Sequence, residues 1–196
     1  MRKFLCLAAF VALCAAPSLA QQTPKIELSA DAAFNRFDTP PGYYLDMPGG
    51  ALSGNYTVFR WLSAKLELSG EYGHRSLVGN TVTAQALAGP QFFPFRHHKI
   101  TPWGEFLFGE GYYRNQIPSF GGFPSQTISG YSFTYQAGLG LDWRIKTHWD
   151  VRPIEFDFVS SKFFASAPNQ VRQSKYRIGV GVVYRIGRGS SMHFHL

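Results

Sequence analysis

A two-residue alternation of apolar and polar side chains runs through most of this sequence. Between residues 26 and 35, apolar residues occupy every even position from Ile26 to Phe34, whereas Glu27, Asp31 and Asn35 occupy odd positions. Successive side chains of a β-strand point to opposite faces, so this period predicts a strand with one oily and one polar face. The alternation recurs near residues 52–58, 65–72, 81–88, 102–113, 131–143, 149–159 and 175–186. The chain is therefore predicted to be all-β, with eight strands.

The seventh of these segments changes parity at Pro153. Trp149 and Val151 are its apolar positions before the proline, and Ile154 and Phe156 are its apolar positions after it. The alternation is therefore shifted by one residue, which is the effect of a β-bulge. A bulge also tolerates a proline, because the extra residue does not need to donate a backbone hydrogen bond to the neighbouring strand. We therefore expect a bulge at Pro153.

The connectors between the segments alternate in length. They are long, tight, intermediate, short, long, tight and long at residues 38–49, 60–63, 74–80, 93–99, 114–130, 146–148 and 160–171. Long loops at one end and short turns at the other are typical of an up-and-down transmembrane β-barrel. The segments are also about ten residues long, which suits tilted strands that cross a bilayer. The predicted architecture is an eight-stranded antiparallel up-and-down transmembrane β-barrel.

Aromatic residues gather where the strands meet the connectors, as they do at the two interfaces of a membrane. Those expected to form the girdle at the turn end are Phe59, Trp61, Phe92, Phe93, Trp143, Trp149 and Tyr184. Those expected at the loop end are Tyr72, Tyr112, Tyr113, Tyr131 and Phe158.

The first twenty residues have the pattern of a secretory signal peptide. Arg2 and Lys3 precede an apolar run over residues 4–15, and Ser18 and Ala20 place small side chains at the −3 and −1 positions of a cleavage site before Gln21. The run is too short for a membrane-spanning helix. We expect a signal peptide over residues 1–20, a barrel domain over 21–187 and a short tail over 188–196.

Both cysteines, Cys6 and Cys14, lie in the predicted signal peptide, so no thiol chemistry is expected in the mature chain. A lipoprotein signal with Cys14 acylated is the alternative, and bulky Leu13 before the cysteine disfavours it. These features predict export into an oxidising compartment.

Composition narrows the class further. The mean hydropathy is −0.12, so a membrane placement after residue 20 would require strands. The formal net charge of +7 becomes +5 once Arg2 and Lys3 are removed. Acidic and basic residues are interleaved without a basic block, which gives little support to nucleic-acid binding.

The charged residues fall almost entirely on the polar face of the strands. If the oily face points outward, these side chains line the interior, where they must pair or share water because an unpaired buried charge is too costly. We expect them either to fill the lumen structurally or to form a gated, narrow ion path through exchange of ion pairs. The set is Glu27, Asp31, Lys65, Glu67, Glu71, Glu105, Asp142, Asp150, Arg152, Glu155, Asp157, Lys175, Arg177 and Arg185.

Side-chain size decides whether the apolar face points outward, toward lipid (oily-out), or inward, into a core (oily-in). A soluble barrel would fill its core with large aliphatic side chains at close-packed density, whereas the oily face here is small at places such as Ala84, Ala86 and Gly54. The polar face combines charges with glycines, among them Gly138 and Gly181, which suits a narrow interior filled by a few long side chains. We favour oily-out and expect Gly181→Ser to be mild. A soluble, ligand-binding barrel is the alternative.

The closing segment, residues 176–187, reads Tyr-Arg-Ile-Gly-Val-Gly-Val-Val-Tyr-Arg-Ile-Gly. Together with the signal peptide, the eight strands and the long loops, it resembles the small outer-membrane β-barrel family that includes the transmembrane domain of outer membrane protein A. Such barrels usually stop at an aromatic residue that ends the last strand, whereas residues 188–196 follow the closing segment here; either Tyr184 or Phe194 would take that place.

The resemblance implies a bacterial outer-membrane protein without enzymatic activity. Its role would be structural, small-porin-like or one of surface interaction, around a mostly plugged polar lumen. The implied partners are the lipid bilayer with lipopolysaccharide and, during biogenesis, the barrel-assembly machinery. We expect a monomer, with no nucleic-acid partner.

His74 and Ser76 raise an enzymatic alternative. A His and a Ser two residues apart share a strand face, as a base and a nucleophile would, and the spacing resembles that of outer-membrane lipid A deacylases. That family needs an acidic third partner and carries its motif nearer the C-terminus, so the sequence predicts no catalytic residues. An acidic side chain beside His74 would favour the enzyme.

Four further histidines, His97, His98, His193 and His195, have no Cys or acidic partner at ligand spacing, so no metal site and no cofactor are expected. The basic residues of the segment 96–99 are expected to meet lipid head groups.

Overall fold

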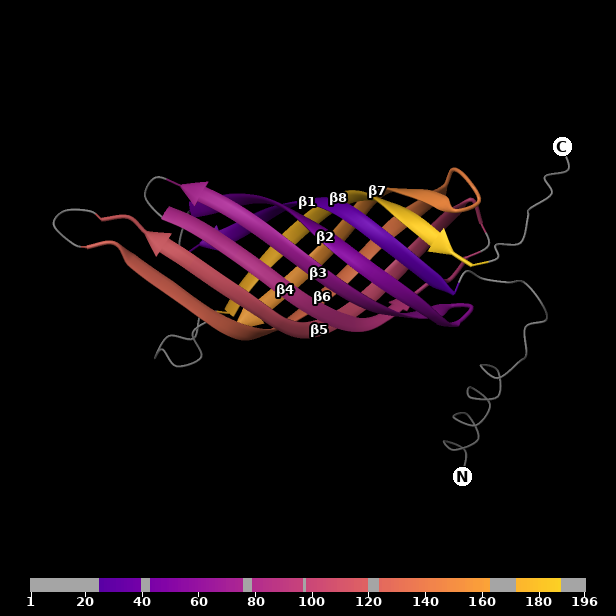
Figure 1. The fold of residues 1–196 in the computed structure, drawn as a ribbon, viewed down its shortest axis with the longest axis horizontal. Helices are drawn as coiled ribbons and strands as arrows, with labels where there is room; N and C mark the ends of the chain where they lie inside the picture. The colour runs from indigo at the N-terminus through magenta and orange to yellow at the C-terminus, as the bar shows by residue number, and fades with distance from the viewer. Residues whose placement is uncertain are drawn as a thin grey trace, which may run out of the picture.

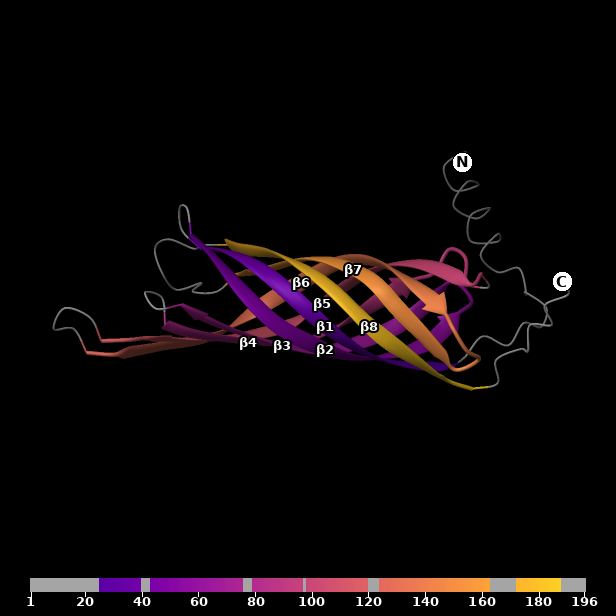
Figure 2. The ribbon, with the colours of Figure 1, turned by 90° about the horizontal axis from the view of Figure 1, so that it is seen from above.

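The computed structural model describes residues 25–39, 43–75, 79–96, 98–119, 124–162 and 172–187, and these form a closed barrel (Figures 1 and 2). The strands are β1 (Ile26–Thr39), β2 (Tyr43–Phe59), β3 (Leu62–Arg75), β4 (Gly79–Phe92), β5 (Ile100–Ile117), β6 (Gln126–Arg144), β7 (Trp149–Lys162) and β8 (Arg172–Ile186). Each strand pairs antiparallel with the next, and β1 pairs with β8. The predicted eight-stranded up-and-down barrel is confirmed. The predicted signal peptide and tail lie outside the described residues.

No helix in the described part of the chain is long and apolar enough to span a membrane.

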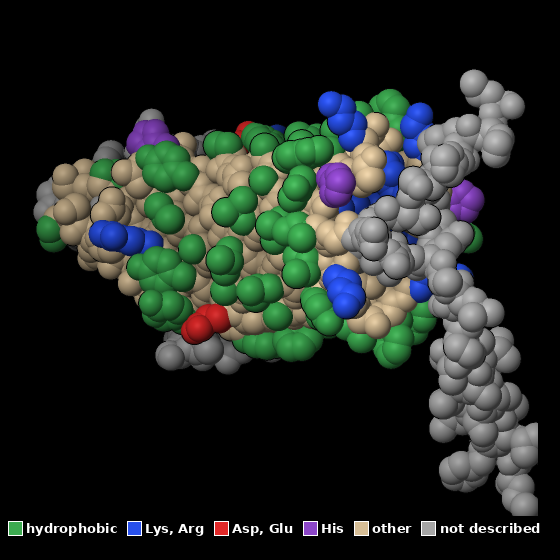
Figure 3. Space-filling model, turned by 45° about the vertical axis from the view of Figure 1, so that its right-hand side comes forward, with side chains coloured by type: hydrophobic (Ala, Val, Ile, Leu, Met, Phe, Trp, Pro, Cys, Tyr) green, Lys and Arg blue, Asp and Glu red, His purple; other side chains and the backbone are tan. Residues whose placement is uncertain are grey.

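The oily face of every strand points outward, and the polar face points into the barrel. Leu52, Tyr131 and Val180 are 64%, 71% and 54% exposed, whereas their neighbours along the strands are buried or half-buried. Figure 3 shows apolar side chains spread over the outer wall. An outer surface of this kind would be unstable in water and matches the hydrocarbon core of a bilayer. The oily-out prediction is confirmed.

The predicted bulge at Pro153 is present. The β7–β8 register shifts between Arg152 and Glu155, so that Pro153 and Ile154 together oppose one residue of β8. A second irregularity, which the alternation did not indicate, shifts the β2–β3 register between Thr57 and Phe59.

The predicted long loop at residues 38–49 is wrong. β1 continues to Thr39, and β2 begins at Tyr43, so most of that stretch belongs to a two-stranded hairpin. Pro48 lies within β2, opposite Phe34 of β1 and beyond the point where β2 starts to pair with β3 at Gly49. The strand is an edge there, and an edge accommodates a proline that cannot donate a hydrogen bond.

The predicted loop at 114–130 is also too long, because β5 and β6 pair as far as Ile117 and Gln126. The resulting hairpin projects beyond the other strands in both ribbon views. Pairing of β6 with β7 starts only at Thr134, opposite Ser161, so residues 126–133 pair with β5 alone among the described residues.

The opposite end of the barrel, which we call the turn end, carries the short connections at residues 60–61, 93–99 and 145–148. β1 begins and β8 ends on this same side (Figure 1). The predicted girdle residues Phe59, Trp61, Phe92, Trp143, Trp149 and Tyr184 are exposed there. Phe93 and Tyr113 depart from the predicted girdles: they are only 1% and 9% exposed, because their side chains point inward.

Candidate functional site

The barrel interior holds the charged residues that the alternation places on the polar face. Every one of them is at most 8% exposed. They come from β1 (Glu27, Asp31), β3 (Lys65, Glu67, Glu71), β5 (Glu105), β6 (Asp142), β7 (Asp150, Arg152, Glu155, Asp157) and β8 (Lys175, Arg177, Arg185). Because alternate residues of closed strands all face one narrow space, charges far apart in sequence are forced into contact.

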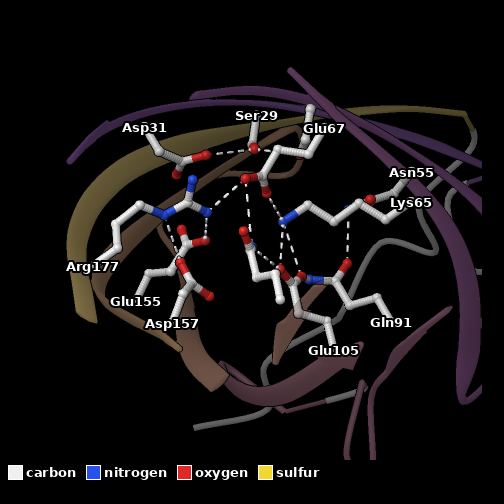
Figure 4. A network of polar contacts seen from close by, with 12 residues as sticks. Ser29, Asp31, Asn55, Lys65, Glu67, Gln91, Glu105, Glu155, Asp157 and Arg177 are labelled. Atoms are coloured by element: carbon white, nitrogen blue, oxygen red, sulfur yellow. Dashed lines mark hydrogen bonds and ion pairs between the residues drawn. The ribbon is translucent and has the colours of Figure 1, made fainter. Parts of the chain in front are cut away.

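Lys65 lies between two carboxylates near the middle of this interior (Figure 4). Its Nζ is 2.8 Å from Glu67 Oε2 and 2.9 Å from Glu105 Oε2. The side-chain amides of Gln136 and Gln91 also donate to Glu105, at 3.0 and 3.2 Å. One cation and two amides therefore compensate the burial of the Glu105 carboxylate.

Arg177 extends the same network to the opposite wall. Its guanidinium is 2.6 Å from Glu67 Oε1 and 2.8 Å from Asp157 Oδ2, and it also approaches Glu155 Oε1 at 3.5 Å. Glu67 thus binds Lys65 with one oxygen and Arg177 of β8 with the other, and Lys65 in turn binds Glu105 of β5, so these pairs connect β3 to two non-adjacent strands. The ion pairs therefore cross the lumen instead of running along its wall.

Arg152 forms a second centre. Its Nε donates to Asp142 Oδ1 at 2.8 Å, and NH1 lies 3.2 Å from Glu155 and 3.4 Å from Asp31. The guanidinium also stacks over Trp103, 4.5 Å from the ring centroid, and the Trp103 indole donates to Asp142 at 3.0 Å. Because Arg presents several donors in one rigid plane, a single residue serves three carboxylates and an aromatic face.

Arg96 closes the turn end of the interior, so the prediction that the basic residues of segment 96–99 meet lipid head groups is wrong for this residue. His98 and Lys99 are exposed, and for them the expectation stays a prediction. Arg96 is 3% exposed; its NH2 is 2.9 Å from Glu27 Oε2, and NH1 donates to Ser63 at 3.0 Å. It also lies 4.0 Å from the Phe93 ring centroid. Arg185 binds Glu27 at 3.3 Å and also pairs with Asp150. The alternation could not identify Arg96, because the residue belongs to a turn.

At the loop end of the interior, Lys175 pairs with Glu71, and Thr83 donates a hydrogen bond to the same carboxylate at 2.7 Å.

Buried carboxylates outnumber buried cations nine to six among the described residues. Glu67, Glu105 and Glu155 place oxygens within 4.8 Å of one another, a geometry that would suit a metal ion. Lys65 and Arg177 already contact these carboxylates, so protein cations supply the positive charge there.

Glycines make room for these side chains, which contradicts the expectation that Gly181→Ser is mild. A Cβ at Gly181 would collide with the Asp31 carboxylate and lie 2.7 Å from the Ala30 carbonyl oxygen. A Cβ at Gly138 would collide with Asp157 and lie 3.1 Å from Glu105. The missing side chains on β6 and β8 are therefore part of the packing of the interior.

His74 does not assemble a catalytic group with the residues that the structure describes around it. Its Nδ1 lies 2.5 Å from the side-chain oxygen of Asn80, which also accepts from Tyr72 at 3.2 Å. The neighbour is an amide, whereas a base in a triad needs a carboxylate. Ser76, His97, His193 and His195 lie outside the described residues, and His98 is exposed.

Neither a protein-family model nor a curated protein sequence matches this chain. Solved structures do. Neisserial surface protein A, at 12% identity, superposes with a TM-score of 0.65 over 83% of this chain and 97% of its own. The attachment invasion locus protein Ail of Yersinia pestis, at 17% identity, gives 0.55 over 83% and 100%.

The N-terminal β-barrel domain of OprF from Pseudomonas aeruginosa, at 12% identity, gives 0.51 over 83% of this chain and 100% of that domain. At such identities the likeness concerns the fold. The barrel is closed, its lumen is lined with charged side chains and its outer face is apolar. Together with these structural neighbours, this shows that the chain has the fold of the small eight-stranded β-barrels of the bacterial outer membrane.

Proposed function

We propose that this protein is a non-enzymatic outer-membrane barrel whose interior is closed by its own ion pairs and serves as a rigid support for the strand extensions at the loop end. The observation that carries the proposal is the contact chain from Lys65 through Glu67 to Arg177, which spans the lumen between β3 and β8. Eight strands enclose a space that side chains can fill. A closed lumen argues against a dedicated pore.

Single-channel recording in planar bilayers tests this proposal. The native protein should give small or rare conductance events. Arg177→Ala removes one of the two cations that contact Glu67 and Glu155 and the cation that contacts Asp157. A buried carboxylate without its cation draws in water, so the events of this variant should be larger or more frequent. Because the interior carries more carboxylates than cations, the currents of this variant should be cation-selective in a salt gradient.

Arg36→Ala is the matched control, since Arg36 is an exposed cation whose pair with Asp46 lies outside the lumen. Its recordings should equal those of the native protein. A shift in gel mobility on boiling in SDS would establish that both variants are folded, as closed barrels resist SDS. A large, steady native conductance would contradict the closed-lumen proposal, and an unchanged Arg177→Ala would remove Arg177 from the plug.

A surface-interaction role is supported by the hairpin of β5 and β6. Residues 126–129 are exposed on both faces of the strand, beyond the level at which β7 pairs with β6. Among the described residues, this part of β6 pairs with β5 alone, so it does not help to close the barrel and leaves backbone groups unpaired along one edge. Removal of residues 117–126 spares every residue that pairs β5 with β4 or β6 with β7, so it should leave the SDS-resistant, closed barrel intact. An unfolded product would show that the hairpin is a structural part of the barrel.

A further inference from the structure

Among the described residues, the outer surface of the turn end carries exposed cations and no exposed carboxylate. Lys25, Arg60, Lys99 and Lys146 are exposed there, and we call them the turn-end collar. They stand before β1 and in the β2–β3, β4–β5 and β6–β7 connections, so one cation occurs at every second strand around the rim. Most of the Lys and Arg side chains visible in Figure 3 lie towards this end. The positive charge is therefore spread around the whole rim.

The acidic residues lie elsewhere. Of those whose side chains the structure describes, only Asp46 and Glu110 are exposed, and both belong to the loop-end half of their strands. The acids nearest the turns, Glu27, Asp142 and Asp150, are at most 1% exposed and face inward. The sequence also has no Asp or Glu in residues 1–24 or 188–196. The collar thus has no acidic neighbours on the outer surface to neutralise it.

The position of the collar along the barrel axis indicates which layer of the membrane it contacts. Directly beside it stands the aromatic girdle, in which Trp61 stacks between Phe59 and Phe92 with ring centroids 6.0 and 6.1 Å apart. Aromatic girdles mark the level of the membrane–water interface. Lys99 Nζ lies 6.0 Å from the Trp143 ring centroid, so at least this cation sits at head-group level.

One part of the rim is also shaped for a lipid. Phe95, His98, Lys99, Ile100 and Pro102 line an open hollow of about 540 Å³ whose exposed surface is mostly apolar. Apolar walls with a lysine and a histidine at the margin match the glycerol region and the phosphate of a phospholipid. A soluble acidic polymer would use the charges but would leave this apolar surface bare.

We propose that the turn-end collar binds the head groups of anionic phospholipids in the leaflet that faces the turns. The inference rests on the membrane placement in the proposed function and adds the class of lipid. Each cation near an anionic surface contributes to the attraction, which weakens as salt screens it. The collar would thereby fix the depth and orientation of the barrel from the side opposite to its loops.

Electron spin resonance with spin-labelled lipids tests the proposal on the full-length folded protein in phosphatidylcholine vesicles. The fraction of motionally restricted label measures association with the barrel. Labelled phosphatidylglycerol should associate about threefold more strongly than labelled phosphatidylcholine at low salt, and less so at high salt. Lys99→Gln/Lys146→Gln, which removes two collar charges, should reduce that preference to about half.

Arg36→Gln/Arg114→Gln is the matched control, because it removes two exposed cations from the loop-end half of the barrel. It should keep the full preference. Equal association of both lipids with the native protein, or equal losses in the two double variants, would overturn the collar as a lipid site. If neither label showed a restricted component, the protein would not be in the bilayer, and the proposed function itself would fail.

Discussion

The inner and outer faces of the barrel are made from alternate residues of the same strands, yet different forces hold them. On β7, Arg152 faces inward and contacts three carboxylates and a tryptophan, whereas Ile154, which follows the bulge at Pro153, is 48% exposed on the outside. Lipid tails are as apolar as isoleucine, so the outer face requires only that a side chain be oily. The inner face requires particular partners at particular distances.

The largest effect should therefore come from breaking an inner centre. Arg152→Ala leaves Asp142, Glu155 and Asp31 without their shared cation, and we expect a loss of about 3–5 kcal/mol in the free energy of unfolding. Urea titration of the protein folded into vesicles measures it. Ile154→Leu on the same strand is the matched outer variant, because it keeps the same number of carbons against the lipid, and it should change stability by about 0.5 kcal/mol or less. Comparable losses would remove the distinction between the faces.

The outer face should be sensitive to charge and to depth. Val180 lies near the middle of β8 and is 54% exposed, so Val180→Arg places a cation in the hydrocarbon and should cost about 2–4 kcal/mol. Ile186 ends the same strand at the turn end, where the same substitution should cost about 0–1 kcal/mol. Refolding titrations of both variants in vesicles check the difference. Equal costs at the two depths would contradict the membrane placement of β8.

The sequence predicted which face each strand residue takes, because the pleat repeats every two residues. It predicted the parity change at Pro153 for the same reason. It did not predict which charges meet: Lys65 and Glu105 are 40 residues apart, and their contact depends on how the closed barrel staggers its strands. The sequence placed Arg96 and Phe93 on the outside, which is wrong, because side chains in a turn do not alternate regularly between two faces.

The strand extensions were missed for another physical reason. Prolines and glycines over residues 40–50 indicate a loop. However, the β2 residues that precede Gly49 pair with β1 only, and an edge strand tolerates such residues.

The comparison of faces also corrects the expectation for Gly181. Its place on the polar face was predicted correctly, whereas the tight contact with Asp31 depends on the packing of two strands and cannot be inferred from alternation.

A smaller effect should follow from adding one methyl group to each face. At Gly181 the new Cβ would meet Asp31 and the Ala30 carbonyl, so Gly181→Ala should cost about 1–3 kcal/mol through overpacking. At Gly54 the nearest atom is Leu28 Cδ2 at 3.7 Å, an ordinary contact, so Gly54→Ala should cost nothing measurable. Parallel thermal unfolding of the two variants in one detergent tests this pair. A neutral Gly181→Ala would show that the lumen is looser than its contacts imply.

The smallest effect should come from an ion pair that is built like the inner ones but lies in solvent. Arg36 Nε is 3.4 Å from Asp46 Oδ1, and the two side chains are 61% and 52% exposed. Water screens both charges, and ordering two long side chains offsets the attraction, so Arg36→Ala should change the free energy of unfolding by about 0–1 kcal/mol. Arg152 meets Asp142 at 2.8 Å with no exposed surface on the arginine, and its loss should cost several times more. Urea titrations of both variants at low and high salt separate the two cases, because salt should weaken only the outer pair. If Arg36→Ala reduced the free energy of unfolding as much as Arg152→Ala, burial would not be the reason for the larger contribution of the inner ion pairs.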